Sequence, residues 1–477
     1  MELTELTIKQ SHEGLKKKDF SSVDLTKAYL EKIKKIDKDL NAFLSVAEES
    51  SLAQALEADA AFAESFGEPK KKIGMLCGIP CAIKDAILVK DQKCTAASKI
   101  LENYVAPYDA TVVKKLKDCG AIILGKTNTD EFTMGASTEN SAFGVVKNPH
   151  DKTKVAGGSS GGSAVAVAAN EACYSLGSDT GGSIRLPASF CGIVGLNPTY
   201  GSVSRYGLIA HASSLDQIGP MTKNVEDCKI VFDAIKGKDP LDVTSVEQKT
   251  QDSISKIKNL RIGVPKEYFS GGLDKEVEKI IRDAIKNFES SGAEIEEISL
   301  PNSQYSIACY YIIVPSEASS NLARFDGIKY GLSVKSENLL NVYLKSRGAG
   351  FGAEPKRRIM VGTHSLSSGY YDAYYKKAQE VRQLIRNDFA NAFKKVDLIF
   401  CPVAPFPAFG IGEKANDPLA MYLVDLYTGA IKLAGLPGLS LPVGKIGKLP
   451  IGLQIIGNHF QEDLILSAAS FIEKSLT

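Results

Sequence analysis

The sequence predicts an α/β protein with a large core. Hydrophobic residues make up 44% of the 477 residues and charged residues 24%, proportions that are typical of ordinary globular proteins. Short apolar runs separated by glycine and proline alternate along the chain with stretches that carry apolar residues at helical spacing. This alternation of strands and helices is typical of an α/β fold.

The first elements are expected to be helices. Ser21, Ser22 and Asp24 form a capping signal, and the apolar residues after them recur at helical spacing. A second helix, rich in alanine, is expected at about residues 51–66. Three strands are then predicted by the apolar runs at residues 82–83, 86–89 and 121–124.

The second half of the chain continues the alternation. Helices are predicted at residues 225–235 and 273–288, on either side of a strand at residues 261–264. A long helix with many charges follows at residues 370–393. Near its end the chain has three apolar strands, predicted at residues 398–401, 439–443 and 452–456. An amphipathic helix is predicted from residue 462 onward.

Composition excludes several classes of function. Lys and Arg number 57 and Asp and Glu 56, so the formal charge of +1 does not support nucleic-acid binding by bulk charge. The sequence has no run of ~20 apolar residues and no signal-peptide pattern at its start, so we expect a cytoplasmic protein without a membrane span. The nine cysteines are scattered singly and the five histidines form no ligand pattern, which predicts reduced thiols and no metal site.

Two short motif matches are expected to be accidental. Residues 120–127 fit the phosphate-binding pattern G-x-x-x-x-G-K-T, but the four variable residues form a predicted strand where that motif needs a loop. Asp179, Thr180 and Gly181 resemble the D-T-G of aspartic proteases, yet the chain contains no second D-[ST]-G to supply the partner carboxylate.

The pattern G-x-S-x-G occurs twice in overlap at residues 157–162 and leaves an alternative open. An α/β-hydrolase could complete a triad in chain order with Ser159, Asp397 and His459. A nucleophile elbow must directly follow a buried strand, however, and the preceding residues 148–154 are polar and typical of turns.

Three blocks in order carry a more specific resemblance. They are Lys84 within residues 79–85, the Gly-Ser loop at residues 157–163, and the segment 178–185, and the match continues through residues 189–201. Together they resemble the amidase signature family. That resemblance implies a large mixed β-sheet covered by helices on both faces, and a Ser-cisSer-Lys triad.

The resemblance assigns roles to the triad. Ser183 is implied as the nucleophile and Ser159 as the group that relays its proton to Lys84. Burial of Lys84 among apolar neighbours would favour the neutral amine that a base needs, whereas a lone strand lysine is otherwise usually exposed. Ser160, Asp179 and Arg185 are expected to be structural, the last two as an ion pair. Backbone N–H groups would stabilise the oxyanion at Thr180, Gly181 and Gly182.

Further segments resemble one branch of the family, the glutaminase subunits of tRNA-dependent amidotransferases. They lie at residues 128–135, 212–220, 318–327 and 368–375. The branch implies glutamine as substrate, an acyl-enzyme on Ser183, and a cation and an anion for the α-carboxylate and α-amine. Arg358 and Asp425 are the candidates, with Arg357 equally available.

The same branch implies a heterotrimer with B and C subunits. Ammonia would pass to a partner subunit that uses ATP and Mg²⁺ to convert Glu-tRNA(Gln) to Gln-tRNA(Gln), and the tRNA would be contacted mainly through the partner. No cofactor is expected in this chain. Two rival functions remain: a stand-alone amidase for another small amide, and a non-catalytic ligand-binding module.

Length alone suggests about three domains at roughly 150 residues each. The motifs from Lys84 to Asp425 are nevertheless expected to converge on one site. We therefore predict a single amidase domain over residues 1–477, with N-terminal helices at 1–70, the signature core with the triad at 71–220, and the rest of the sheet and the substrate pocket at 221–477.

Overall fold

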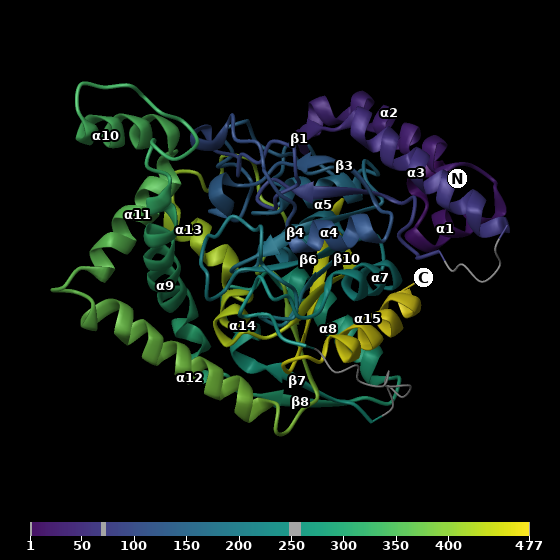
Figure 1. The fold of residues 1–477 in the computed structure, drawn as a ribbon. Helices are drawn as coiled ribbons and strands as arrows, with labels where there is room; N and C mark the ends of the chain where they lie inside the picture. The colour runs from purple at the N-terminus through teal and green to yellow at the C-terminus, as the bar shows by residue number, and fades with distance from the viewer. Residues whose placement is uncertain (1, 68–72, 248–258, 477) are drawn as a thin grey trace.

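A mixed β-sheet runs through the whole molecule. The computed structural model describes residues 2–67, 73–247 and 259–476, in which the sheet has 11 strands in the order β1-β3-β2-β4-β6-β5-β10-β11-β9-β7-β8 (Figure 1). The strands are β1 (Phe43–Val46), β2 (Pro80–Lys84), β3 (Ile122–Thr127), β4 (Tyr174–Asp179), β5 (Val194–Asn197), β6 (Gln217–Thr222), β7 (Arg261–Pro265), β8 (Glu294–Ile298), β9 (Leu398–Pro402), β10 (Gly438–Ile446) and β11 (Leu449–Gly457). The predicted α/β class and mixed sheet are confirmed.

Strand direction follows from the connections. β2 pairs in parallel with β3 and β4, and β7 with β8 and β9, whereas the remaining pairs are antiparallel. Parallel neighbours need a crossover. Helix α4 (Thr111–Asp118) supplies it between β2 and β3, and helix α8 (Lys275–Glu289) between β7 and β8. β10 and β11 form a hairpin whose tight turn contains Gly447 at a φ of +60°.

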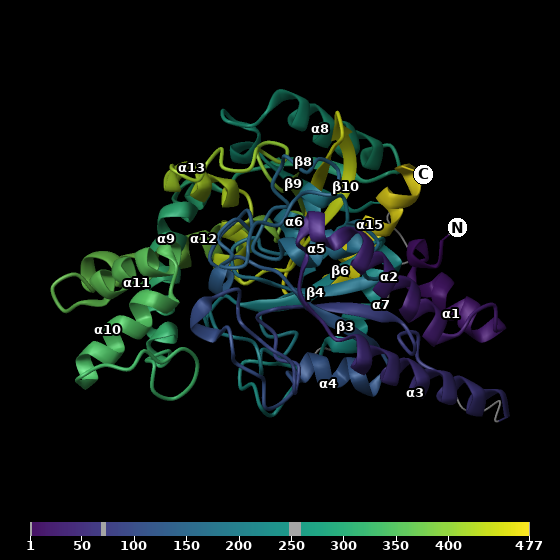
Figure 2. The ribbon, with the colours of Figure 1, turned by 90° about the horizontal axis from the view of Figure 1, so that it is seen from above.

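Helices cover both faces of the sheet (Figures 1 and 2). In β9, Leu398 and Phe400 belong to one buried apolar cluster with α8 and α15, and Ile399 and Cys401 to another with α9, α12 and α14. The helices are α1 (Ile8–Lys17), α2 (Ser22–Leu40), α3 (Glu48–Gly67), α4 (Thr111–Asp118), α5 (Gly161–Ala168), α6 (Arg185–Cys191), α7 (Val225–Ile235), α8 (Lys275–Glu289), α9 (Ser306–Asn321), α10 (Leu339–Gly350), α11 (Ala353–Leu366), α12 (Lys377–Ala392), α13 (Pro418–Tyr422), α14 (Gly429–Ala434) and α15 (Glu462–Leu476).

Most predicted elements are present. The capping signal at Ser21 forms a reciprocal capping box with Asp24 at the start of α2. The long helix expected at residues 370–393 begins with a π-helical turn (Asp372–Lys376) before α12. The boundary predicted between residues 70 and 71 lies outside the described residues.

The strand predicted at residues 86–89 is wrong. The N–H of Ile87 donates to the carbonyl of Lys84 at 2.9 Å, which turns the chain directly after β2. Ile87 keeps only an isolated bridge to Leu208. This run is apolar because all four side chains are buried in the core, not because it extends the sheet.

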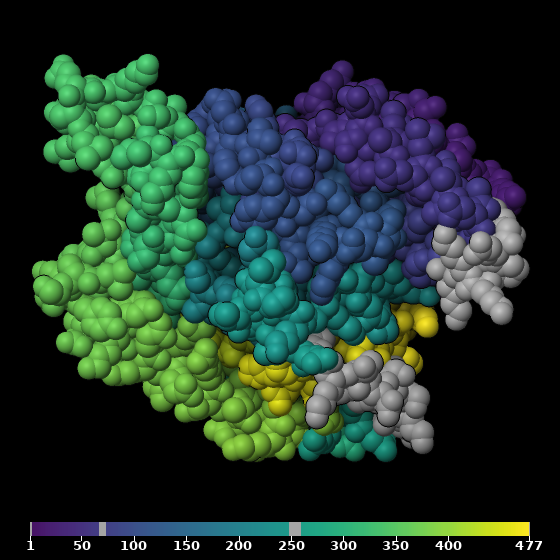
Figure 3. Space-filling view, viewed as in Figure 1, coloured from purple at the N-terminus to yellow at the C-terminus, as the bar shows by residue number. Residues whose placement is uncertain are grey.

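Helices α9, α10 and α11 lie along one flank of the sheet, and α10 stands out from the body of the molecule (Figures 2 and 3). α9 packs against α11, α12 and α14. This helical layer faces the ends of the central strands, and it supplies part of the candidate site described below.

Several general features of the described residues bear on function. All nine cysteines are free thiols. No group of three or more side chains in the described ranges is arranged to hold a metal ion. Among these residues there is also no helix with the length and apolar character to span a bilayer.

Candidate active site

Lys84 lies at the end of β2, between the parallel strands β3 and β4, and is completely buried. Its Nζ donates to Ser159 Oγ at 2.7 Å and to Ser160 Oγ at 2.8 Å, and it lies 3.3 Å from the carbonyl oxygen of Ser178. Lys84 is therefore not the solvent-exposed strand lysine that the segment alone would suggest. It connects the Ser159 loop to β4, the strand that precedes Ser183.

Burial lowers the pKa of Lys84 to about 7, although Asp130, Asp179 and Asp216 act in the opposite direction. Desolvation penalises the ammonium form, and no carboxylate in the described residues lies within ion-pair distance of Nζ to restore it. A large fraction of the neutral amine is thus present at neutral pH, as a general base requires.

Ser159 lies in the glycine-rich loop before α5, and the peptide bond between Gly158 and Ser159 is cis. A Cβ at position 158 would lie 2.2 Å from Asp130 Oδ2 and 2.7 Å from the backbone nitrogen of Ser137. Only glycine fits there. Asp130 thereby packs directly against the loop, and its own carboxylate is held by the N–H groups of Thr138 and Asn140.

Ser183 lies between β4 and α6 and is 7% exposed, whereas Ser159 and Lys84 are fully buried. Its carbonyl accepts from the N–H of Ser160 at 3.1 Å, which joins the two serine loops. The Ser183 hydroxyl makes no hydrogen bond to the described residues. Of the three expected triad members, the structure brings Lys84 and Ser159 into contact and leaves Ser183 beside them with its hydroxyl free.

The loop before Ser183 is packed closely by the helical layer. A Cβ at Gly181 would lie 2.5 Å from Tyr310 Oη, and one at Gly182, where φ is +156°, would lie 2.3 Å from Thr428 Oγ1. The backbone N–H groups of Thr180, Gly181 and Gly182 donate to no acceptor in the described part of the chain. The loop can therefore direct free N–H groups at a developing oxyanion.

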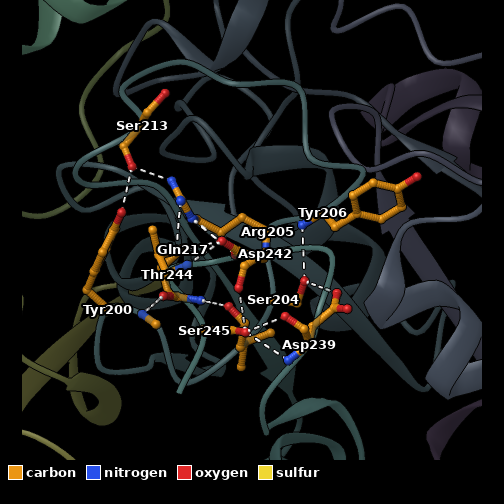
Figure 4. Close-up of polar contacts among 12 residues, drawn as sticks. Tyr200, Ser204, Arg205, Tyr206, Ser213, Gln217, Asp239, Asp242, Thr244 and Ser245 are labelled. Carbon is orange, nitrogen blue, oxygen red and sulfur yellow. Dashed lines mark hydrogen bonds and ion pairs between the residues drawn. The ribbon is translucent and has the colours of Figure 1, made fainter. Parts of the chain in front are cut away.

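The side chain of Thr180 is hydrogen-bonded to the carboxylate of Asp216. Its Oγ1 donates to Asp216 Oδ1 at 2.7 Å, and the same carboxylate accepts from the N–H groups of His211 and Ala212. The neighbouring Gln217 accepts from the N–H of Gly201 and donates to the carbonyl of Val203, next to a polar network in which the N–H of Arg205 donates to Asp242 (Figure 4). This network fixes the segment that carries Asp216.

Asp179 and Arg185 form the structural ion pair that the sequence predicts. Both are fully buried, and Arg185 Nη2 lies 3.1 Å from Asp179 Oδ1. Burial acts to raise the pKa of Asp179, but Arg185 and Lys432 hold it below its usual value. Arg185 also donates to Gln454 and to the carbonyl of Thr428, so the pair links β4 to β11 and the α14 segment.

Arg358, on α11, is 4% exposed, whereas the side chain of Arg357 is 45% exposed. Arg358 Nε donates to Glu354 Oε1 at 2.8 Å, and its guanidinium lies 5.3 Å from the ring centre of Tyr311 and 5.9 Å from that of Tyr422. Arg357 pairs with the other oxygen of Glu354 from the solvent side. Arg358 is thus the one of the two that faces the interior.

Asp425 ends a short 3₁₀ turn (Leu423–Asp425) and is 7% exposed. Its Oδ2 accepts from Tyr311 Oη at 3.2 Å, and burial raises its pKa to about 7 against the influence of Arg358. Its carbonyl accepts from the N–H of Thr428, the residue that packs on Gly182. Asp425 and Arg358 therefore both contact Tyr311, and Asp425 lies next to the nucleophile loop.

Sequence reasoning missed several residues of this site. Tyr310, Tyr311 and Glu354 lie in helical segments without a recognisable motif, and Asp130 and Asp216 are single carboxylates among many. Only the two aspartates could have been found from the sequence, because they fall inside segments that resemble the glutaminase branch.

The triad expected for an α/β-hydrolase is not assembled. Asp397 is paired with Arg261 at 2.7 Å, and the imidazole of His459 lies beside Asn458. Ser159 instead accepts from Lys84. The phosphate-loop match also falls within the sheet, because residues 122–127 form β3 and Lys126 donates to the carbonyl of Ile87 in the core.

Comparison with known proteins defines the class. The model of the amidase family matches residues 24–466, and the chain belongs to that family. It is 55% identical to the A subunit of the glutamyl-tRNA(Gln) amidotransferase of Thermoanaerobacter pseudethanolicus, and the match covers 100% of this chain and 97% of the relative. It is 53% identical to the same subunit of Desulfatibacillum aliphaticivorans, and that match covers 100% of this chain and 98% of the relative. The crystal structure of the corresponding A subunit of Thermotoga maritima matches with a TM-score of 0.82 and 42% identity, over 99% of this chain and 95% of that one.

Proposed function

We propose that this chain is the glutamine-hydrolysing A subunit of a glutamyl-tRNA(Gln) amidotransferase. The observation that carries the proposal is the buried contact of Lys84 with Ser159 next to Ser183, with Arg358 and Asp425 on the adjoining helical layer. The full-length similarity to curated A subunits supports the substrate. A plain amidase for apolar amides would have no use for a buried cation and anion beside the nucleophile.

In the proposed reaction, Ser183 Oγ attacks the side-chain carbonyl carbon of glutamine. The Ser183 proton passes to Ser159 while the Ser159 proton passes to neutral Lys84, and the N–H groups of Thr180 to Gly182 stabilise the oxyanion. Collapse of the tetrahedral intermediate breaks the C–N bond, and the proton returns through Ser159 to the leaving ammonia. Water then hydrolyses the ester by the same relay and releases glutamate.

Arg358 and Asp425 bind the α-carboxylate and α-ammonium groups of glutamine in this proposal. Replacing Asp425 by asparagine is expected to raise the KM for glutamine at least ~30-fold, because the ammonium loses its buried counter-charge. Arg358→Lys is expected to weaken binding similarly, since a lysine cannot keep the fork geometry. Steady-state kinetics with glutamine check both variants. Arg357→Lys, on the exposed side, is the matched control, and a similar loss in that variant would contradict the assignment.

The chain is further proposed to act within a heterotrimer with B and C subunits in the cytoplasm. Ammonia would pass to the partner, whose reaction on Glu-tRNA(Gln) would use ATP and Mg²⁺, and the partner would make most tRNA contacts. This division fits the formal charge of +1. We also propose that residues 1–477 work as one amidase domain, because a single sheet includes strands from both ends of the chain.

Purification of the native protein under mild conditions tests the assembly. We expect it to copurify with two other subunits, and we expect the complex to convert Glu-tRNA(Gln) to Gln-tRNA(Gln) with glutamine and ATP. A monomer that is fully active on diverse small amides without any partner would instead support the stand-alone amidase. A folded chain that binds amides without hydrolysing them would support the binding module.

A further inference from the structure

His211 is a buried imidazole at the candidate site that the proposed reaction does not use. It is 2% exposed and lies in the bend before β6. Its Nε2 lies 3.4 Å from Arg358 Nη1, and its Nδ1 lies 3.2 Å from Thr133 Oγ1. The ring therefore joins α11 to the short 3₁₀ turn at Glu131–Thr133.

These two contacts define the tautomer. A guanidinium can only donate, so Nε2 must be the unprotonated nitrogen that accepts from Arg358. The ring proton then sits on Nδ1 and points at Thr133 Oγ1, which accepts it. Burial, Arg358 and Lys84 all lower the pKa of His211, so the imidazole is neutral.

The contacts of Arg358 show what this arrangement achieves. Nε donates to Glu354 and Nη1 to His211, while the guanidinium lies near the stacked rings of Tyr311 and Tyr422. Nη2 makes no hydrogen bond to any described residue. The guanidinium is thus held at Nε and Nη1, and three of its five N–H bonds, two of them on Nη2, are left for a ligand.

We propose that His211 is a positioning residue that orients Arg358 for the α-carboxylate of the substrate. The proposal rests on the proposed function, because it assigns the Nη2 amino group of Arg358 to glutamine. Removing the acceptor leaves a donor of a buried cation without a partner, so the guanidinium rotates away from its productive orientation. The loss should concern binding of the carboxylate and not the chemistry at Ser183.

The backbone at His211 is held independently of its ring, which makes the position suitable for substitution. Its N–H donates to Asp216 Oδ2 at 2.9 Å, and its carbonyl accepts from Asn321 Nδ2 at 3.2 Å. His211→Leu removes the acceptor. His211→Gln keeps an acceptor for Arg358 and a donor for Thr133, and the shorter His211→Asn serves as a second disruptive variant if the leucine variant does not fold.

The test is steady-state kinetics of the full chain, with any subunits that copurify, on two substrates. L-Glutamine carries the α-carboxylate, and L-glutaminamide replaces it by a neutral amide. For His211→Leu we expect the KM for glutamine to rise about tenfold with kcat within about twofold, and the KM for glutaminamide to stay unchanged. His211→Gln should keep the KM for glutamine within about threefold of the wild type.

The control is His364→Leu, an exposed histidine on α11, which should leave all constants unchanged. An unchanged KM for glutamine in His211→Leu, or an equal rise on both substrates, would overturn the role of His211. If the wild-type protein itself hydrolyses no glutamine, the proposed function fails instead, so the two failures are distinguishable.

Discussion

Replacement of Ser183 by alanine is expected to lower kcat for glutamine hydrolysis by at least ~10⁴-fold, because the variant has no group that can form the acyl-enzyme. Ser183 is the one member of the triad with exposed surface, and its hydroxyl is not engaged by the described residues. The measurements are ammonia release and mass-spectrometric detection of the glutamyl ester. Neither ester nor turnover should be found in the variant.

Two control variants distinguish the loss of the nucleophile from general damage to the site. In the α/β-hydrolase alternative, His459 is the general base. His459→Ala should nevertheless leave activity nearly intact, since His459 lies beside Asn458 and away from Lys84. Ser213→Ala changes an exposed serine and should also be silent. Retained turnover in Ser183→Ala would exclude the triad, and a loss of several orders of magnitude in His459→Ala would restore the alternative.

Substitution of Lys84 is expected to have the second largest effect, a fall in kcat of about 10³-fold or more. Lys84→Met removes the base, and Lys84→Arg keeps a cation that cannot lose its proton at neutral pH. Both variants should therefore be inactive. An active arginine variant would show that Lys84 acts as a fixed positive charge and not as a base.

The pH profile of the wild type gives an independent check. Because burial lowers the pKa of Lys84 to about 7, the neutral amine increases as the pH rises through 7. At saturating glutamine, whose ammonium keeps Asp425 ionised, kcat should then rise about tenfold per pH unit below this value and level off above it. Burial also lowers the pKa of Lys432 to about 7, but Lys432 contacts Asn197, so Lys432→Gln should keep the profile. Loss of the transition in that variant would assign it to Lys432.

The elements with strong apolar periodicity could be predicted from the sequence, but strands β4 and β6 could not. β4 and β6 lie in the middle of the sheet but contain serine, glycine and proline. Gly177 in β4 explains why, because a Cβ there would lie 2.9 Å from Ser160 Oγ. Strands that border the site thus carry small and polar residues for the needs of the site, and this hides the strand pattern.

The chemistry of the site was easier to predict than its binding pocket. Ser159 and Ser183 lie in glycine-rich segments and Lys84 in a short apolar block before them, and the resemblance of these three blocks is specific. Arg358 could not be distinguished from Arg357 in the sequence, since only the packing of α11 against α9 makes one of them interior. Tyr310 and Tyr311 enter the site through a contact between helices, for which local sequence gives no signal.

The division of the site between sheet and helices has an evolutionary consequence. Lys84 ends β2, Ser183 follows β4 and Ser159 precedes α5, whereas Tyr311 and Arg358 come from α9 and α11 and Asp425 from the turn after α13. Substitutions in these helical segments can alter which amide is accepted while the proton relay stays intact. The fold is in this sense modular, and changes in α9, α11 and the α13 segment can give a descendant a new substrate without a change in the sheet.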